Sequence, residues 1–232
     1  MDKASDGVRE GVVLLHGIMR TSRSLSRLAS HLGGKGFEVL NLDYPSTRLS
    51  LGELAEDVHG AISAFSARVD RVHFVGFSMG GLVIRAYLKV HRPANLGRVV
   101  MIGTPNNGSE IADILKGNRF YMALLGPAGQ QLVTNQTAFR HLFEDQDFEL
   151  GVIAGRNVAN PIAAAIFKGP NDGKVSVASA VLPSCRDHIV IRTNHTLIAL
   201  SGRTHAETCE FLRVGRFSEG AVRMAGISTA AK

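Results

Sequence analysis

The amino-acid sequence predicts an α/β fold, a mostly parallel, doubly wound sheet with helices on both of its faces. Short apolar runs recur along the chain, which is typical of strands that are buried on both faces. Stretches with apolar residues at helical spacing lie between these runs. Strands and helices therefore alternate, as they do in βαβ units. With 232 residues, 45% of them hydrophobic, the chain can bury a sizeable core, and we expect a single domain over residues 1–232.

The first part of the chain follows this alternation closely. Apolar runs predict buried strands at residues 11–15, 37–42, 72–75 and 99–103. A helix with an apolar stripe follows an N-cap at Thr21 or Ser22 and stops at the glycine-rich residues 33–36. Residues 51–69 carry the clearest helical stripe, and residues 82–90 form another behind the third strand.

The alternation breaks between residues 104 and 147, where the sequence has no strand pattern. Short helical pieces are expected at about 110–115, 120–125 and 130–135. Because this segment lies between two core strands, it would cover the carboxyl ends of the sheet, where α/β proteins bind ligands. We interpret it as a short helical cap that walls the substrate pocket, although ordinary surface helices would give the same pattern. The expected pocket residues are Ile111, Leu115, Tyr121, Met122 and Leu125.

The alternation resumes after this segment. We expect strands at residues 148–154 and 188–192, with a turn at 170–173 between them. Helical stretches are expected at 197–200 and 205–214. Residues 174–177 alternate in polarity, as a short strand does. Residues 216–232 are rich in Gly, Ala and Ser and weakly patterned, so we expect a loosely held tail.

The bulk composition argues against several classes of protein. The net charge is +6 and the pI is about 9.7, but no basic cluster carries interleaved aromatic residues, so the sequence does not indicate nucleic-acid binding. A basic surface would favour weak contact with anionic membranes or acidic substrates, and solvated surplus charge is the simpler interpretation. No apolar run could span a bilayer, and the polar N-terminus lacks a secretory signal, so we expect a cytoplasmic protein. Nothing in the sequence indicates an oligomeric state.

The chain has two cysteines, Cys185 and Cys209. Two cysteines make neither a disulfide framework nor a zinc-ligand cluster. We expect buried or half-buried thiols, and the sequence leaves a single bridge between them open as the alternative.

One short stretch gives the clearest indication of chemistry. The apolar run at 72–75 leads directly into Gly76-Phe77-Ser78-Met79-Gly80, and a helical stripe follows. Strand, tight turn and helix are the context that a nucleophilic serine in a G-x-S-x-G sequence requires. The flanking glycines let the neighbouring strand and helix pass close to the turn, and the helix points its positive end at an oxyanion formed there. We therefore predict Ser78 as a nucleophile.

A serine hydroxyl needs a base that takes its proton, and the base needs an acid that orients it. Among the histidines after Ser78, His195 falls in a loop just past the carboxyl end of a late strand, level with the serine, and we predict it as the base. The other histidines after the serine are His91, His141, His188 and His205. We predict Asp172, in its Asn-Asp-Gly turn, as the acid. Its rivals are Asp187, which would lie at the wrong end of the last strand, and Asp145, which lies in the insertion.

An oxyanion hole needs two backbone N–H groups. On this kind of turn, one belongs to the residue after the nucleophile, Met79, and the other to the loop after the first strand, where Ile18 is the candidate. We expect His16, in the same loop, to be structural and to hold the loop down by hydrogen bonds.

Several motifs of the chain resemble those of the α/β-hydrolase superfamily, and most of all its small bacterial lipases and esterases and their relatives that act on lipid-linked acyl esters. The resemblance covers about residues 12–200. Its motifs are Leu15-His16-Gly17-Ile18, Gly76-Phe77-Ser78-Met79-Gly80-Gly81, Ile102-Gly103-Thr104-Pro105-Asn106-Asn107-Gly108-Ser109, Asn171-Asp172-Gly173-Lys174-Val175 and Asn194-His195-Thr196. The resemblance implies an α/β-hydrolase fold, a triad of Ser78, Asp172 and His195, and oxyanion donors at Ile18 and Met79.

We therefore predict a serine hydrolase that cleaves carboxylic esters through an acyl-enzyme on Ser78. Its substrate would be a small acyl ester or a lipid, and neither a metal nor a cofactor is implied. A thioesterase, an amidase or an acyltransferase would use the same triad and stays open as an alternative enzyme. A non-catalytic, hydrolase-like binding protein is the alternative from another class.

Overall fold

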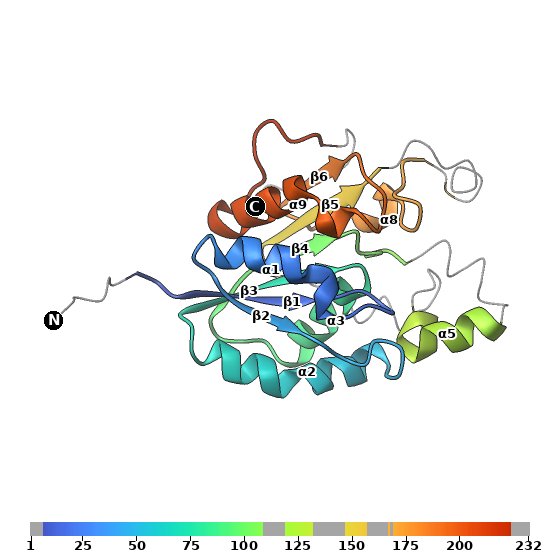
Figure 1. Cartoon of the computed structure of the whole chain (residues 1–232), viewed down its shortest axis with the longest axis horizontal. Coiled ribbons are helices and arrows are strands. Elements are labelled where there is room, and N and C mark those ends of the chain that lie inside the picture. The colour runs from blue at the N-terminus through green and yellow to red at the C-terminus, as the bar shows by residue number, and fades with distance from the viewer. Residues whose placement is uncertain (1–6, 109–118, 132–146, 157–166, 168, 224–232) are drawn as a thin grey trace.

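A computed structural model of the chain describes residues 7–108, 119–131, 147–156, 167 and 169–223 (Figure 1). Its strands form one six-stranded parallel sheet in the order β2-β1-β3-β4-β5-β6. The strands are β1 (Glu10–Leu15), β2 (Glu38–Leu42), β3 (Arg71–Phe77), β4 (Leu96–Ile102), β5 (Leu150–Gly155) and β6 (Asp187–Ile191).

The strand order shows a chain that winds in two directions. From β1 it runs outward to β2, returns to β3 on the other side of β1, and then continues in order to β6. The predicted parallel, doubly wound sheet is thus confirmed. The winding reverses between the carboxyl ends of β1 and β3, which is the point where such sheets bind ligands.

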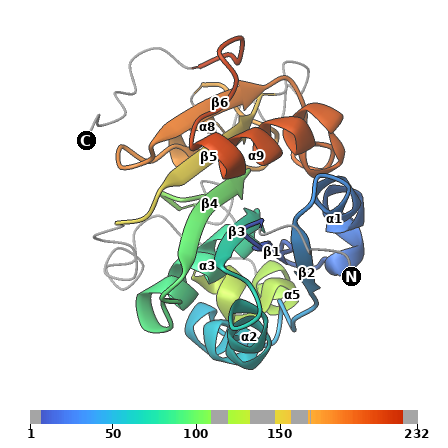
Figure 2. The same cartoon turned by 90° about the vertical axis from the view of Figure 1, so that its left-hand side faces the viewer.

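Helices cover both faces of the sheet, as predicted. Figure 1 shows α2 (Leu51–Ser66) below the sheet. The helices α3 (Met79–Val90) and α8 (Val177–Ala180) pack in the same core cluster as α2. The opposite face carries η1 (Ser22–Leu25), α1 (Ser26–Gly33), η2 (Ile198–Leu200) and α9 (Gly202–Val214). Figure 2 shows α1 and α9 side by side along that face. None of the described helices is both long and apolar enough to cross a membrane.

The burial of β1 explains why its sequence is a continuous apolar run. Val13 and Leu15 pack in the core cluster on the α2 side, whereas Val12 and Leu14 pack in the cluster on the α1 side. All four side chains are fully buried. From residue 12 to residue 15 the strand is covered on both faces, so this stretch has no polar position.

The longest helix, α2, starts at a capping box. Ser50 Oγ accepts a hydrogen bond from the backbone N–H of Glu53 at 3.3 Å, and the Glu53 carboxylate accepts one from the backbone N–H of Ser50 at 2.8 Å. These bonds satisfy two amides that would otherwise lack partners. The helix ends at Ser66, three residues earlier than the expected 69.

Two other elements differ from the expectation. Residues 174–177 form no strand, because only an isolated bridge joins Asn171 to Ser176 before α8 begins at Val177. The last helix starts at Gly202 rather than at 205, since Ser201 caps it by accepting a hydrogen bond from the Thr204 N–H.

Part of the predicted insertion is described. Helix α5 (Arg119–Gln130) includes the helical piece expected at 120–125 and has a kink at Gly126. Its end is tied to the loop before α2, because Ala128 N donates to Leu49 O at 3.1 Å and Leu51 N donates to Gln131 Oε1 at 2.8 Å. Figure 1 shows α5 beyond the carboxyl ends of the strands, as expected of a cap. The piece expected at 110–115 and most of 130–135 lie outside the described residues.

The segment 216–223 is held firmly, so the expectation of a loose tail is wrong for these residues. Phe217 is 1% exposed and packs against Phe211 of α9. The Asp187 carboxylate accepts hydrogen bonds from the Phe217 N–H at 2.9 Å and from the Arg223 guanidinium at 2.9 and 2.8 Å. One buried aromatic residue and one ion pair thus anchor a segment whose composition gives no periodic signal.

Replacing Asp187 with asparagine is expected to lower the free energy of unfolding by about 2 kcal/mol, since the bonds of a charged group are lost. Burial raises the pKa of this carboxyl, but Arg223 and the Phe217 N–H outweigh burial and hold its pKa below the usual value. In the unfolded chain the pKa of this carboxyl is about 4. Because its pKa is lower in the folded protein, the ionised carboxylate stabilises the fold above about pH 4, and this contribution is lost as the pH falls through the folded pKa. Thermal unfolding from neutral to acidic pH should show the difference between wild type and Asp187→Asn shrinking as the pH falls. An unchanged difference across that range would contradict this role.

Both cysteines are free and buried. Cys185 lies in the core cluster on the α2 side of the sheet and Cys209 in the cluster on the α1 side, so the sheet separates them. Burial raises the pKa of the Cys185 thiol to about 11. The expectation of buried thiols is confirmed, and the alternative of a bridge between them is wrong.

Candidate active site

Ser78 occupies the sharp turn between β3 and α3. Its backbone has φ 55° and ψ −125°, a conformation that residues other than glycine rarely adopt and that costs energy. The turn is held on both sides, because Ser78 N donates to Ile102 O at 2.8 Å and Gly81 N donates to Ser78 O at 3.1 Å. A strained serine that the surrounding backbone fixes in place is typical of a nucleophile.

The two glycines of the pentad are required by close contacts of the backbone. A Cβ atom on Gly76 would lie 2.4 Å from the Cα of Gly81, and one on Gly80 would lie 2.1 Å from the carbonyl oxygen of Leu15. Neither distance is possible for real atoms. The strand and the helix therefore pass the turn as closely as the sequence pattern predicts.

A continuous chain of hydrogen bonds joins Ser78, His195 and Asp172. His195 Nε2 lies 3.0 Å from Ser78 Oγ, and His195 Nδ1 lies 2.7 Å from Asp172 Oδ2. The other carboxylate oxygen, Oδ1, accepts hydrogen bonds from the N–H groups of Lys174 at 2.9 Å and Val175 at 2.8 Å. Asp172 is 1% exposed and His195 7%. The structure thus brings together the three residues that the sequence predicts as a triad.

The rival acids and bases lie elsewhere or have other partners. Asp187 binds Arg223, and His188 follows it at the start of β6, the end of the strand away from Ser78. His205 Nε2 hydrogen-bonds Ala199 O at 2.8 Å. His91 caps the far end of α3, where it pairs with Glu56 at 2.8 Å. The remaining rivals, His141 and Asp145, lie outside the described residues.

The loop after β1 runs against the serine. A Cβ atom on Gly17 would lie 3.1 Å from the Cβ of Ser78, so the backbone next to Ile18 borders the nucleophile. Met79 is the first residue of α3, and the N–H of a first helical residue has no acceptor within the helix. Both predicted oxyanion donors thus belong to backbone that adjoins Ser78. Their catalytic role stays a prediction.

Tyr44, which the sequence analysis does not single out, locks this loop. Its ring stacks on His16 with centroids 4.2 Å apart, and its hydroxyl donates a hydrogen bond to the His16 carbonyl. His16 Nδ1 in turn lies 2.8 Å from Gly17 O. Burial raises the pKa of Tyr44 and lowers that of His16, so the tyrosine keeps its proton and the histidine stays neutral. The expected structural role of His16 agrees with these contacts.

A buried arginine holds the loop after β4. Arg85 Nη1 donates hydrogen bonds to Asn106 O at 3.0 Å and Asn106 Oδ1 at 3.1 Å, and the Asn106 amide donates to Ala180 O at 2.7 Å. Burial lowers the pKa of Arg85 to about 9. The only sequence signal is that Arg85 lies in the middle of a mostly apolar helix, whose other charged residue is Lys89 in the last turn, and this does not by itself reveal a partner.

Comparison with known proteins agrees with this architecture. Residues 12–209 match the model of a family described as the alpha/beta hydrolase family. The chain belongs to the alpha/beta hydrolase family.

Curated relatives of this alpha/beta hydrolase include lysosomal thioesterases. The chain is 26% identical over 194 residues to lysosomal thioesterase PPT2 of Homo sapiens. This alignment covers 71% of this chain and 64% of the human protein. It is 32% identical over 103 residues to the Bos taurus protein of the same name. This shorter alignment covers 42% of this chain and 34% of the bovine protein. The hydrolase therefore spans less than two thirds of the length of these relatives.

Solved structures with a similar fold include bacterial lipolytic enzymes. The mature form of lipase BlEst2 from Bacillus licheniformis has a TM-score of 0.73 and 20% identity, covering 92% of this chain and 96% of that one. Phospholipase PlaB from Legionella pneumophila has a TM-score of 0.60 and 16% identity, and the match covers 74% of this chain and 45% of that one. At these identities the likeness shows the fold alone.

The predicted pocket residues of the hydrolase are described only in part. Ile111 and Leu115 lie outside the described residues. Tyr121 and Met122 lie on α5, although the structure describes only their backbone. Leu125 is buried in the same helix. These residues stay a prediction for the acyl pocket.

A pocket that the sequence did not predict opens beside His195. Its volume is about 390 Å³. It is lined by Asp172, Gly173, Lys174, Asn194, His195, Thr196 and Leu197. The pocket is formed by two loops that are separate in the sequence, so no local sequence pattern predicts it. Its position next to the imidazole makes it a place where part of a substrate can lie.

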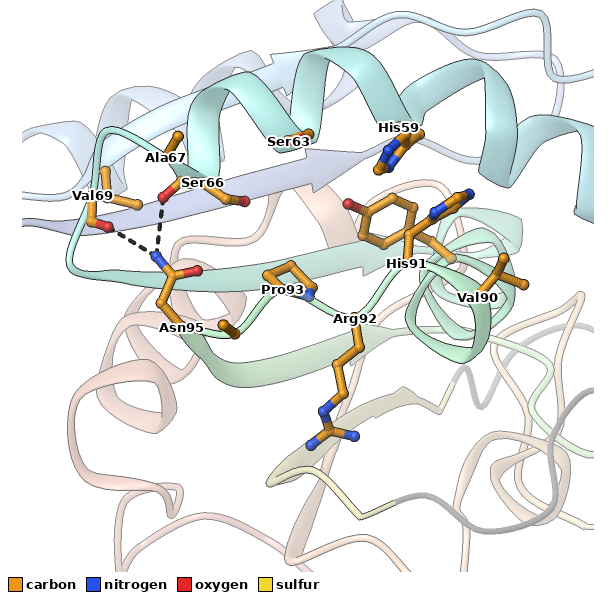
Figure 3. Close-up of a pocket in the computed structure, with 12 residues that line it drawn as sticks. His59, Ser63, Ser66, Ala67, Val69, Val90, His91, Arg92, Pro93 and Asn95 are labelled. Atoms are coloured by element: carbon orange, nitrogen blue, oxygen red, sulfur yellow. Dashed lines mark hydrogen bonds between the residues drawn. The ribbon is translucent and has the colours of Figure 1, made fainter.

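A larger pocket of about 570 Å³ lies away from this site, between α2 and the carboxyl end of α3 (Figure 3). Figure 3 shows the rings of His59 and His91 stacked at its edge, with centroids 3.8 Å apart. At its other end, the Asn95 amide donates hydrogen bonds to the carbonyls of Ser66 and Val69. Because α3 leads away from Ser78, this pocket has no part in the chemistry of the serine.

Proposed function

We propose that this alpha/beta hydrolase cleaves carboxylic esters through a covalent acyl-enzyme on Ser78. The observation that carries the proposal is the hydrogen-bonded chain from Ser78 Oγ through His195 to Asp172. A serine, a base within hydrogen-bond reach of it, and a buried acid behind the base are the parts that acyl transfer needs.

The proposed reaction has two halves. Ser78 Oγ attacks the ester carbonyl while His195 Nε2 takes the hydroxyl proton, and the protonated imidazole then gives that proton to the leaving alcohol. In the second half, His195 activates a water that hydrolyses the acyl-enzyme. Asp172 keeps the imidazole in the tautomer with its proton on Nδ1, because the carboxylate can only accept a hydrogen bond there.

The N–H groups of Ile18 and Met79 are the proposed donors to the oxyanion. Two such donors typically supply several kcal/mol in the transition state, since they are fixed before charge develops. The contact between His16 and Tyr44 supports this assignment, because it holds the loop that carries Ile18.

The proposed site for the leaving group is the pocket of about 390 Å³ beside His195. The histidine must reach the leaving oxygen to protonate it, so the leaving group has to lie against the imidazole. The acyl chain then lies on the other side of Ser78, under α5, where Leu125 is buried. The expected substrates are small acyl esters or lipid esters.

Thioester cleavage is the second candidate, and the similarity to proteins named lysosomal thioesterases favours it. A thiol leaving group needs less help from a general acid than an alcohol, because the thiolate is the weaker base. A set of matched esters, thioesters and amides with acyl chains of graded length separates these activities. We expect kcat/KM to be highest for esters and lowest for amides. A protein that turns over none of them would contradict the proposed hydrolase activity.

A further inference from the structure

A pocket of about 510 Å³ lies at the edge of the sheet formed by β6. Its lining comes from the ends of β5 and β6, the start of α9 and the segment that follows α9. The lining residues are Arg156, Val190, Ile191, Arg192, Ser201, Arg203 and Val222. The catalytic chain of Ser78, His195 and Asp172 contributes none of them.

Three arginines from separate elements thus meet in one pocket. Arg156 follows β5, and its backbone N–H donates a hydrogen bond to Ile191 O at 2.8 Å. This bond holds the backbone of Arg156 beside the end of β6. Arg192 follows β6 directly, and Arg203 is the second residue of α9. All three are exposed side chains around a shared hollow. Like charges that are gathered in this way repel one another unless an anion lies between them.

Little acidic charge offsets these arginines. Among the residues that the structure describes, no ion pair involves the side chain of Arg156 or Arg192. Glu207 lies 4.0 Å from Arg203 Nε, but its two oxygens also accept hydrogen bonds from the hydroxyl and N–H of Ser218 at 2.6 and 3.0 Å. The pocket therefore carries surplus positive charge.

The pocket also combines features that suit a phosphoryl group. Guanidinium groups present paired N–H donors that match phosphate oxygens in two-bond geometry. The Ser201 hydroxyl is close by, at the N-cap of α9, and the first turn of that helix adds its positive end. The apolar side chains of Val190, Ile191 and Val222 offer a surface for the carbon part of such a ligand.

We propose that this pocket binds a phosphoryl group carried by a small amphipathic molecule, either a soluble phosphate ester or a phospholipid headgroup. The site lies apart from the proposed triad, so binding there does not require the hydrolase mechanism. In this proposal, the three arginines of the pocket contribute to the net charge of +6 and also bind the ligand.

Calorimetric titration with inorganic phosphate and with glycerol 3-phosphate tests the soluble source. Co-sedimentation with phosphatidylcholine vesicles, with and without phosphatidate, tests the lipid source. We expect saturable binding in one of these arms that weakens as ionic strength rises. Arg156→Gln and Arg192→Gln should each weaken it about fivefold, and the double variant should abolish it.

Arg27→Gln is the matched control, because Arg27 is exposed on α1 and its loss changes the net charge by the same amount. This variant should bind as the wild type does. Equal weakening by Arg27→Gln and Arg192→Gln would show a general charge effect and overturn the proposal. Absence of binding in every arm would overturn it as well. Both arginine variants alter exposed side chains, and their unfolding temperatures check that the fold is intact.

Discussion

Replacing Ser78 with alanine is expected to lower kcat for p-nitrophenyl acyl esters by a factor of about 10⁴ or more, because no acyl-enzyme can form. The fold should survive this change. The backbone of residue 78 keeps its hydrogen bonds to Ile102 and Gly81, and only an oxygen whose partner is His195 is removed. The measurement is initial-rate kinetics of the purified variant, with its unfolding temperature as the check on structure.

Ser30→Ala is the matched control for this experiment. Ser30 is exposed on α1, on the far side of the sheet from α3, so its loss should leave kcat at the wild-type value. A Ser78→Ala protein that folds normally and retains more than a small fraction of wild-type turnover would exclude the covalent mechanism.

Replacing Asp172 with asparagine is expected to lower kcat by a factor of about 10³ to 10⁴ with little change in the structure of the turn. The N–H groups of Lys174 and Val175 both donate to one carboxylate oxygen, so the oxygen of the asparagine amide should stay on that side. Its NH₂ group then faces His195 Nδ1. An NH₂ group donates rather than accepts, so it selects the tautomer whose proton is on Nε2, and that nitrogen can no longer take the proton of Ser78.

Asp187→Asn separates this effect from a general loss of a buried carboxylate. Asp187 is also buried, but its partners are Phe217 and Arg223, away from His195. We expect Asp187→Asn to lose stability and keep its kcat, and Asp172→Asn to show the reverse. Equal losses of kcat in the two variants would contradict the assignment of Asp172.

Much of the fold can be predicted from the sequence because its signals are local. A strand that is buried on both faces has to be apolar, and the fully buried stretches 12–15 of β1 and 99–102 of β4 show that pattern. The turn at Ser78 is predictable for a steric reason, since any side chain at Gly76 or Gly80 would collide with neighbouring backbone. Of the candidate site, the positions of Ser78 and His195 follow from the ends of β3 and β6, whereas Asp172 is indicated by its Asn-Asp-Gly turn.

The remaining features depend on pairs of residues that are distant in the sequence. Asp187 and Arg223 are 36 positions apart, and neither position has a pattern that reveals the other. Tyr44 and His16 meet only because β1 and β2 are neighbours in the sheet. The composition of residues 216–223 gives no periodic pattern, but the buried Phe217 and the ion pair of Arg223 with Asp187 hold this segment in place.

The most direct test of the central claim is the mass of the protein after reaction with a fluorophosphonate, which modifies only activated serines. We predict one adduct per chain, and peptide mapping should place it on Ser78. The Ser78→Ala protein should gain no mass, and Asp172→Asn should react far more slowly than the wild type. A wild-type protein that stays unmodified, or an adduct that persists in Ser78→Ala, would contradict the claim that Ser78 is an activated nucleophile.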